Sequence, residues 1–176
     1  MEIEILDKTF VPYISAIEID KEVRRIAAEL KNDFSDEIPV FLVVLNGAFM
    51  FAADLMKYYS HPAEVSFIKV ASYQGTETTG NVTQLVGLDT DLTNRHVVII
   101  EDIVDTGNTL MALHQLVNRF KIKSIKVATL FFKPEAYTKD LPIDFAGFRI
   151  SNKFIVGYGL DYNQQGRNLS EVYQIK

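Results

Sequence analysis

The stretch VVIIEDIVDTGNTL, residues 97–110, decides the fold class of this 176-residue chain. It opens with Val97–Ile100, a β-branched run typical of a strand that is buried on both faces of a parallel sheet. Three carboxylates follow at Glu101, Asp102 and Asp105, and the turn 106–109 leads into a helical pattern. A strand, an acidic edge, a turn and a helix in this order favour an α/β fold with a ligand at the end of the strand.

The turn 106–109 predicts an anion site. Thr106 and Thr109 bring hydroxyls, and the backbone N–H groups at a helix N-terminus hold a phosphate well. The three carboxylates would repel a phosphate alone, so the ligand should also bring hydroxyls, a metal ion or a group that needs a base. Glu101 and Asp102 suit a diol or a metal bound through oxygen atoms, whereas Asp105, inside the turn, suits a general base.

The alternative is a plain helix cap. Thr106 or Asn108 would cap the helix, Gly107 would ease the turn, and the acids would only favour the helix N-terminus. Three acids within five residues, at the end of a buried strand, exceed what a cap requires. The turn matches neither the GxxxxGK[ST] phosphate loop nor the GxGxxG dinucleotide fingerprint.

The flanking sequence predicts further strands and helices of an α/β sheet. A helical repeat after the turn and the strand Ile125–Phe132 form a βαβ unit, which makes Val97–Ile100 and Ile125–Phe132 parallel. The other expected elements are a helix with the buried face Ile19, Val23, Ile26, Ala27 and Leu30, the strand Val40–Leu45, an apolar helix over about 48–59, the strand Val65–Ala71, a polar loop over Ser72–Thr83, and short strands and turns covering the sheet over Phe145–Leu160. The ligand should lie at the carboxyl ends of the strands, where Asn46-Gly47 and residues 101–109 fall.

Composition narrows the class of protein. A chain of 176 residues with 48% hydrophobic and 23% charged residues suits one globular domain. It has no apolar run of the ~20 residues that a membrane-spanning helix needs, and its acidic N-terminus lacks a secretory layout. The absence of cysteine fits a cytoplasmic location. The net charge of −5 argues against a broad nucleic-acid surface, so neither nucleic acid nor membrane is expected as a partner.

Three segments in the expected order resemble one enzyme family. VVIIEDIVDTGNTL is similar to the phosphoribosyl-diphosphate motif of the type I phosphoribosyltransferases. FFKPEAY at 131–137 and DFAGFRISNKFIVGYGLDYNQQGRNL at 144–169 resemble the base-binding region of the hypoxanthine-guanine members of that family. Ser72 and Tyr73 resemble the start of the family's flexible loop, and the similarity runs from about Val40 to the C-terminus.

The resemblance implies a fold and a reaction. The fold would be that of the type I phosphoribosyltransferases, a mainly parallel sheet flanked by helices, in a single domain 1–176 with a core of about 35–135 and a hood at the base-binding end, formed largely by about 136–176 with the N-terminus. The reaction would be purine salvage, the Mg²⁺-dependent transfer of ribose-5-phosphate from phosphoribosyl diphosphate to N9 of hypoxanthine or guanine, a 6-oxopurine base. A homodimer or homotetramer is implied as well.

The resemblance also assigns roles within the opening motif. Glu101 and Asp102 would meet the ribose hydroxyls and the Mg²⁺, and Asp105 would handle the proton on purine N7 as the catalytic residue. The 5′-phosphate would lie on the turn 106–109. The whole phosphoribosyl segment is Glu101, Asp102, Ile103, Val104, Asp105, Thr106, Gly107, Asn108 and Thr109.

The base would be read from the second half of the chain. Lys133 would donate to purine O6, which favours 6-oxopurines over adenine with its amino group there. Phe154 would stack on the base, Ile155 would read its edge through the backbone, and Lys153 completes the segment. Asp161 would be a further acid at the base and the metal. Lys133 as a solvated loop lysine, Phe154 as a core residue and Asp161 as a solvated acid are the alternatives.

Pyrophosphate would meet Asn46, Gly47 and Arg167, with a surface arginine as the alternative for the last. The family often has Lys or Arg after the first strand, where Asn46 brings only an uncharged amide, so backbone amides near Gly47 would contribute more. Asn152 stands where an Asp is frequent. These departures bear on pyrophosphate affinity rather than on the class of reaction.

Two other functions remain open. A transferase that prefers xanthine fits the same residues, because hypoxanthine, guanine and xanthine all carry an oxygen at C6. A regulator that senses nucleotides and binds RNA on the same fold would need a coherent basic face, which the net charge of −5 does not favour.

Overall fold

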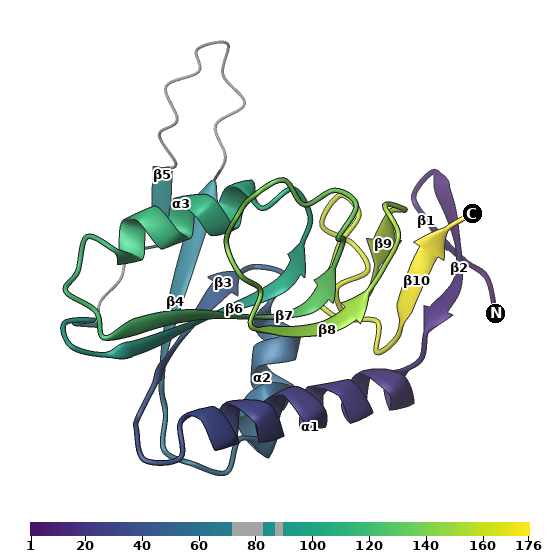
Figure 1. The fold of residues 1–176 in the computed structure, drawn as a ribbon. Coiled ribbons are helices and arrows are strands. Elements are labelled where there is room, and N and C mark those ends of the chain that lie inside the picture. The colour runs from purple at the N-terminus through teal and green to yellow at the C-terminus, as the bar shows by residue number, and fades with distance from the viewer. Residues whose placement is uncertain (72–82, 87–89) are drawn as a thin grey trace.

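A six-stranded sheet forms the centre of the protein in the computed structural model, which describes residues 1–71, 83–86 and 90–176 (Figure 1). Its order is β5-β4-β3-β6-β7-β8, and every neighbouring pair is parallel except the antiparallel pair β4 and β5. The strands are β3 (Val40–Leu45), β4 (Glu64–Ala71), β5 (Thr83–Val86), β6 (His96–Val104), β7 (Ser124–Phe132) and β8 (Phe145–Arg149). The expected α/β class with a mainly parallel sheet is confirmed.

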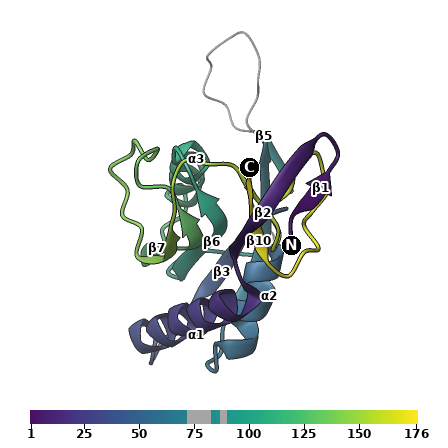
Figure 2. The same ribbon diagram turned by 90° about the vertical axis from the view of Figure 1, so that its right-hand side faces the viewer.

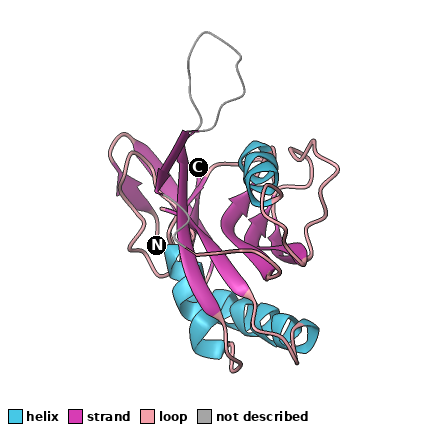
Figure 3. Cartoon of the chain, turned by 90° about the vertical axis from the view of Figure 1, so that its left-hand side faces the viewer, coloured by secondary structure: helices cyan, strands magenta, loops and turns pink. Residues whose placement is uncertain are grey.

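Helices cover both faces of this sheet. The helices α1 (Ala16–Asp33) and α2 (Phe49–Tyr58) lie on one face, and α3 (Asn108–Val117) lies on the other (Figures 1 and 3). The strand order explains this arrangement. The connection from β3 to β4 runs toward one edge and the connection from β6 to β7 runs toward the other, so right-handed crossovers place their helices on opposite faces.

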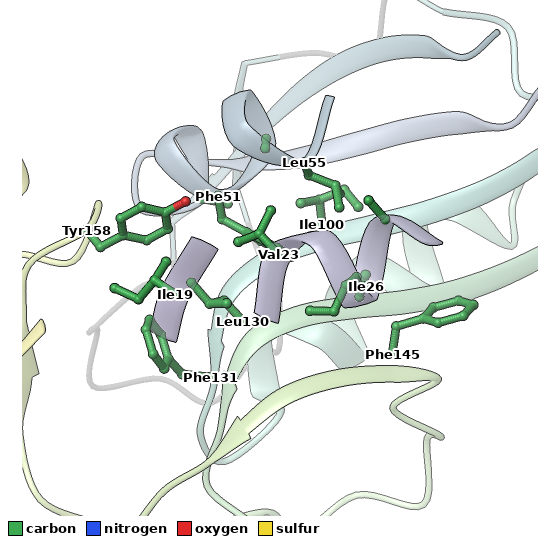
Figure 4. Packing of buried hydrophobic residues seen from close by; sticks show 14 of the residues in the cluster. Ile19, Val23, Ile26, Phe51, Leu55, Ile100, Leu130, Phe131, Phe145 and Tyr158 are labelled. Atoms are coloured by element: carbon green, nitrogen blue, oxygen red, sulfur yellow. The ribbon is translucent and has the colours of Figure 1, made fainter. Parts of the chain in front are cut away.

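Two apolar clusters fill the space between the sheet and its helices. The first lies beneath α1 and α2, where Val23, Ile26 and Leu55 pack against Ile100 and Leu130 of the sheet (Figure 4). The second lies under α3 and contains Leu110, Leu113 and Val117 together with strand residues. All five residues of the expected apolar face of the first helix, Ile19, Val23, Ile26, Ala27 and Leu30, are buried.

A second, four-stranded sheet joins the two ends of the chain. Its order is β1-β2-β10-β9, all antiparallel, with β1 (Ile3–Ile5), β2 (Lys8–Ile14), β9 (Ile155–Val156) and β10 (Val172–Ile175) (Figure 2). This sheet lies in the segments from which the sequence analysis builds the hood. It buries Phe10 and Val156 in a small cluster of its own.

Several boundaries differ from the expected ones. Strand β6 does not end at Ile100 but continues to Val104, because Ile103 and Val104 pair with Phe131 and Phe132 of β7. Glu101 and Asp102 therefore lie within the strand rather than beyond it. The segment Phe145–Arg149 does not cover the sheet, since it extends the sheet as the parallel edge strand β8.

The other expected elements agree closely with the structure. The strand Val40–Leu45 has the expected bounds, and Val97–Ile100 is parallel to Ile125–Phe132. Ser72, Tyr73 and nearly all of the expected loop Ser72–Thr83 lie outside the described residues. No helix in the described part of the chain is long and apolar enough to cross a membrane.

Candidate active site

The candidate site lies where the direction of the sheet connections reverses, between β3 and β6. Ligands of open α/β sheets bind at the carboxyl ends of the strands at such a point, because the diverging connections leave a crevice there. A cavity of about 380 Å³ opens at this place. It is lined by Val44, Leu45, Gly47, Val70, Glu101, Asp102, Ile103, Val104, Asp105, Thr106, Gly107, Asn108, Thr109, Leu110, Asp161 and Arg167.

The two helices that begin at this edge have no side-chain cap, whereas the remaining helix is fully capped. Ser15 and Glu18 form a capping box at the start of α1. Within the described residues, no side chain caps α2 at Ala48 or α3 at Gly107. The interpretation of residues 106–109 as a plain cap is therefore wrong, because the N-cap is Gly107 in a left-handed conformation with φ 82°. The backbone N–H groups at the start of α3 remain available for an anion.

Asp102 is held against the loop that follows β3. A Cβ atom on Gly47 would overlap the carboxylate of Asp102, so only glycine permits this approach. The Leu45–Asn46 peptide is cis, and the Asn46 side chain is exposed and does not line the cavity. The carboxyl ends of β3 and β6 are thus in contact through the backbone of Gly47 and the side chain of Asp102.

Glu101 and Asp102 form an acidic pair in which Glu101 is buried and Asp102 is partly buried. Glu101 is only 5% exposed, and its pKa is raised well above the ordinary value by burial and by the negative charge of Asp102. Burial also raises the pKa of Asp102, although the backbone N–H of Ile103, which donates to its Oδ1 at 2.8 Å, and the charge of Arg167 act in the opposite direction. Two adjacent buried carboxyls cannot both ionise cheaply, so this site favours a cation or several hydrogen-bond donors.

Lys133 and Asp105 are paired across the mouth of the site. Lys133 follows β7 and is only 7% exposed, so it is not the solvated loop lysine of the alternative interpretation. Its Nζ donates to Asp105 Oδ2 at 2.9 Å, and its backbone N–H donates to the carbonyl of Val104 at 2.9 Å. The Asp105 side chain is about half exposed. One donor and one acceptor therefore lie side by side next to the cavity.

Arg167 and Asp161 form a second ion pair, on the side of the small sheet. Arg167 Nη2 lies 2.6 Å from Asp161 Oδ1, and Arg167 Nη1 donates to the carbonyl of Gly159 at 2.8 Å. Gly159 lies so close to the carbonyl of Gly47 that a Cβ atom would overlap it. Arg167 is thus partly buried in the cavity wall, and the surface-arginine interpretation is wrong.

The expected base-reading segment, residues 153–155, does not line the cavity. The Phe154 side chain is 43% exposed, so it is not a core residue, and its ring packs beside Phe10 and Tyr162 with centroids 6.3 and 5.9 Å away. Ile155 is buried in β9, and Lys153 is exposed.

Most of the residues selected from the sequence converge on the cavity. All of residues 101–109 line it, together with Gly47, Asp161 and Arg167. Asn46, Lys133, Lys153, Phe154 and Ile155 do not line it. The lining residues Val44, Leu45, Val70 and Leu110 are apolar and carry no chemical signal in the sequence beyond their place at a strand end or in the first turn of a helix.

A protein-only metal centre is absent from the described residues, where no three His, Cys, Asp or Glu side chains converge to hold an ion. Glu101 and Asp102 are nevertheless adjacent, buried and acidic. Mg²⁺ is commonly held by one or two carboxylates together with substrate oxygens and waters, so this pair fits an ion that arrives with its substrate.

Glu101→Gln should stabilise the protein and make its stability less dependent on pH. Because the folded state raises the pKa of Glu101, it binds a proton that the unfolded chain has already released, so stability falls as pH rises from the ordinary glutamate pKa toward the raised one. Glutamine cannot ionise and removes this loss. Urea unfolding between pH 5 and pH 8 should show a gain that grows with pH and reaches about 1–3 kcal/mol.

The exposed Glu135→Gln serves as the matched control and should leave the pH profile of stability unchanged. A loss of stability in Glu101→Gln at pH 8 would contradict the electrostatic account of the acidic pair.

Comparisons with known proteins agree with this geometry. Residues 15–163 match the phosphoribosyl transferase domain. The chain is 42% identical to the hypoxanthine-guanine phosphoribosyltransferase of Bacillus subtilis (strain 168) over 164 residues, covering 93% of this chain and 91% of the relative. It is 41% identical to the hypoxanthine-guanine-xanthine phosphoribosyltransferase of Tritrichomonas foetus, covering 90% and 87%.

Solved structures show the same fold. A hypoxanthine-guanine phosphoribosyltransferase from Bacillus anthracis superimposes with a TM-score of 0.88 at 37% identity, covering 94% of this chain and 96% of that one. A hypoxanthine phosphoribosyltransferase from Staphylococcus aureus gives a TM-score of 0.89 at 34% identity, covering 94% and 91%. These matches confirm the expected type I fold, and the chain belongs to the phosphoribosyl transferase family.

Proposed function

We propose that this chain is a purine salvage enzyme that transfers ribose-5-phosphate from phosphoribosyl diphosphate to N9 of hypoxanthine and guanine and releases pyrophosphate. The observation that carries the proposal is the Lys133–Asp105 pair beside the acidic cavity. The names of the relatives, which include hypoxanthine-guanine and hypoxanthine-guanine-xanthine phosphoribosyltransferases, support the same reaction.

The pair matches the edge of a 6-oxopurine. O6 and N7 are neighbours on the purine, O6 accepts hydrogen bonds, and N7 carries a proton in the acceptor base. Lys133 Nζ is a donor and Asp105 Oδ2 is an acceptor 2.9 Å away. A base that lies across the two can bind O6 to the ammonium and present its N7 proton to the carboxylate. Adenine has an amino group in place of O6 and would leave Lys133 without an acceptor.

The phosphoribosyl group belongs at the other end of the cavity. The turn 106–109 offers backbone N–H groups and hydroxyls at the uncapped start of α3, which suits a 5′-phosphate. Glu101 and Asp102 lie next to this turn and can accept hydrogen bonds from the ribose 2′ and 3′ hydroxyls. Hydroxyl donors would also reduce the cost of ionising the buried acidic pair.

Mg²⁺ fits the same acidic pair. Glu101 and Asp102 would hold it, with Asp161 as a third acid of the cavity wall, and the ion would supply positive charge to the pyrophosphate and the ribose oxygens. Asp161 now pairs with Arg167, so it can serve a metal only by sharing or leaving that partner.

The transfer itself is a substitution at ribose C1. The bond between C1 and the pyrophosphate oxygen breaks, its electron pair leaves with pyrophosphate, and N9 of the purine forms the new bond. Asp105 takes the N7 proton as N9 is alkylated, so the nucleotide leaves uncharged at the ring. The acids near C1 stabilise the positive charge that develops on the ribose.

The pyrophosphate site has one cationic side chain fewer than it would have with a Lys or Arg after β3. Asn46 contributes no charge, so Arg167 and the backbone N–H groups near Gly47, at the uncapped start of α2, are the proposed contacts. Arg167 suits phosphate oxygens because its planar fork can donate two parallel hydrogen bonds. Phe154, Ile155 and Lys153 stay assigned to the base, whose preference at the 2-position these residues do not decide.

A transfer assay with phosphoribosyl diphosphate, Mg²⁺ and hypoxanthine, guanine, xanthine or adenine tests the reaction. We expect turnover with hypoxanthine and guanine and none with adenine. Lys133→Met should raise the KM for hypoxanthine and for guanine about 10–100-fold, because a charge-assisted hydrogen bond worth about 1.5–3 kcal/mol is lost. The exposed Lys121→Met is the matched control and should behave as wild type. Turnover with adenine, or an unchanged KM in Lys133→Met, would contradict the assignment of Lys133.

Asp105→Asn should lower kcat about 10²–10⁴-fold, because asparagine cannot accept the N7 proton. The amide still fits the half-exposed position, so binding of inosine monophosphate, measured by calorimetry, should change by about threefold or less. Asp140→Asn, an exposed acid on the connection after β7, is the control. A kcat near wild type would remove Asp105 from its role as the base.

We also propose that the enzyme is a homo-oligomer. Val65 and Phe67 of β4 stand in register with Phe41 and Val43 of β3, so all four point to the sheet face that α1 and α2 cover. Phe41 and Val43 are buried, yet Phe67 remains 46% exposed and Val65 39% exposed. Phe49, on α2, is exposed as well. Large apolar side chains that the helices leave uncovered favour a contact with a second copy.

Analytical ultracentrifugation should find wild type at a multiple of the 20.0 kDa chain mass, and Phe67→Glu should shift it toward the monomer. Ile17→Glu changes an apolar residue of α1 that is 83% exposed, and it should leave the mass unchanged. Wild type sedimenting as a monomer would contradict the proposal. A cytoplasmic location remains a prediction from the lack of cysteine.

A further inference from the structure

The connection between β7 and β8 packs against the outside of the phosphate turn (Figure 1). A Cβ atom on Gly107 would lie 2.5 Å from Cε2 of Tyr137 and 2.8 Å from Cγ of Lys139. The Tyr137 ring is therefore in direct contact with the backbone of the residue at the N-cap of α3. Neither Tyr137 nor Lys139 is among the residues that line the cavity.

Hydrogen bonds tie the same connection to the strand end and the turn at two points, its first residue and its middle. The Lys133 N–H donates to the Val104 carbonyl at 2.9 Å, and Thr138 Oγ1 donates to the Thr106 carbonyl at 3.3 Å. The Tyr137 hydroxyl donates to the carbonyl of Leu141 at 2.7 Å. The connection thus follows the backbone of residues 104–107 from outside.

The Tyr137 ring itself is held in place. It meets Phe132 edge-to-face, with centroids 5.4 Å apart and an interplanar angle of 77°, and it packs against the apolar cluster beneath α3. Its hydroxyl is anchored at Leu141. A ring fixed on two sides can support the backbone on its third side.

The turn needs such support. Gly107 has a left-handed φ of 82°, and no side chain within the described residues caps α3. Glycine is the most flexible residue, so its conformation is not fixed by its own backbone preference. The N–H groups of residues 107–109 bind a phosphate well only if they point to one place before the ligand arrives.

We infer that Tyr137 is a positioning residue for the phosphate turn. Its ring packs against Gly107 and thereby keeps the turn preorganised for the 5′-phosphate. The inference rests on the proposed function, because it assigns a support to that phosphate site. Its consequence is selective. Loss of the ring should weaken recognition of the phosphate end of a ligand and leave recognition of the purine end largely intact, since Lys133 is held separately by Val104 and Asp105.

Calorimetry with inosine monophosphate and inosine isolates the phosphate. The two ligands differ only in the 5′-phosphate, so the Kd for inosine divided by the Kd for inosine monophosphate measures what the turn contributes. Tyr137→Ala should reduce this ratio about tenfold, and in the transfer assay it should raise the KM for phosphoribosyl diphosphate by a similar factor while the KM for hypoxanthine changes less than about threefold. Tyr137→Phe keeps the ring and should remain near wild type.

Ile143→Ala is the control for a purely structural effect. Ile143 packs, partly buried, against the same apolar cluster, and the three heavy atoms nearest to a Cβ on Gly107 belong to Tyr137 and Lys139 instead. Its truncation should lower the melting temperature without changing the Kd ratio. Where Tyr137→Ala unfolds, Tyr137→Leu keeps apolar volume without the flat ring and carries the same expectation.

A double-mutant cycle tests the contact directly. Gly107→Ala alone should weaken phosphate binding both through the strained φ and through overlap with the Tyr137 ring. In the Tyr137→Ala background the overlap with the ring is removed and only the close approach to Lys139 Cγ remains, so the fold-change caused by Gly107→Ala should be smaller.

The outcomes separate the inference from the proposed function. Equal changes in both Kd values, an unchanged ratio, or the same change in Ile143→Ala would overturn the role of Tyr137. If wild-type protein transferred ribose-5-phosphate to no purine yet bound inosine monophosphate tighter than inosine, the reaction would be wrong and the support of the turn would still be tested by the ratio.

Discussion

The reversal of the sheet connections between β3 and β6 is the constraint on which the rest of this structure depends. It places α2 and α3, the helices of the two diverging connections, on opposite faces, and it leaves the carboxyl ends of two neighbouring strands uncovered. Two helices start at this edge without side-chain caps, so backbone donors for two anions meet in one cavity. In the proposed function, the two phosphate ends of phosphoribosyl diphosphate would bind at these two helix starts.

The acidic residues at this edge reduce the stability of the folded protein. Glu101 and Asp102 are placed inside β6 by continued pairing with β7, and burial raises the pKa of both. Such a pair destabilises the free protein, and it becomes favourable when hydroxyls or a cation arrive. The apolar strand residues before it, Val97–Ile100, are fully buried and offset this cost. The first half of β6 thus stabilises the fold, whereas its last residues line the cavity. Such a division is common at functional sites.

The sequence predicted the local elements well because apolar residues follow burial, at helical spacing in α1 and as a continuous run in β3. Val40–Leu45 was predicted with its bounds, and all of residues 101–109 line the cavity as expected. What the sequence did not reveal depends on contacts between distant segments. Lys133 meets Asp105 across 28 positions, and β2 pairs with β10 from the opposite end of the chain. Side-chain type and spacing carry no signal for such pairings. The end of β6 was misplaced for a related reason, since polar residues continue a strand when the neighbouring strand continues to pair with them.

The connection after β7 shows how a site for two chemically different groups can be kept in register. Lys133 begins this connection and reaches Asp105, while Tyr137, four residues later, contacts Gly107. In the proposed function, the same short segment would therefore position both the purine end and the phosphate end of the ligand. Its backbone is hydrogen-bonded to Val104 and Thr106, the residues on either side of Asp105. In the proposed reaction, Asp105 would take the proton of a purine positioned by Lys133, and the turn 106–109 would place the ribose. A shared support would then fix the distance between the two reacting atoms better than two independent loops could.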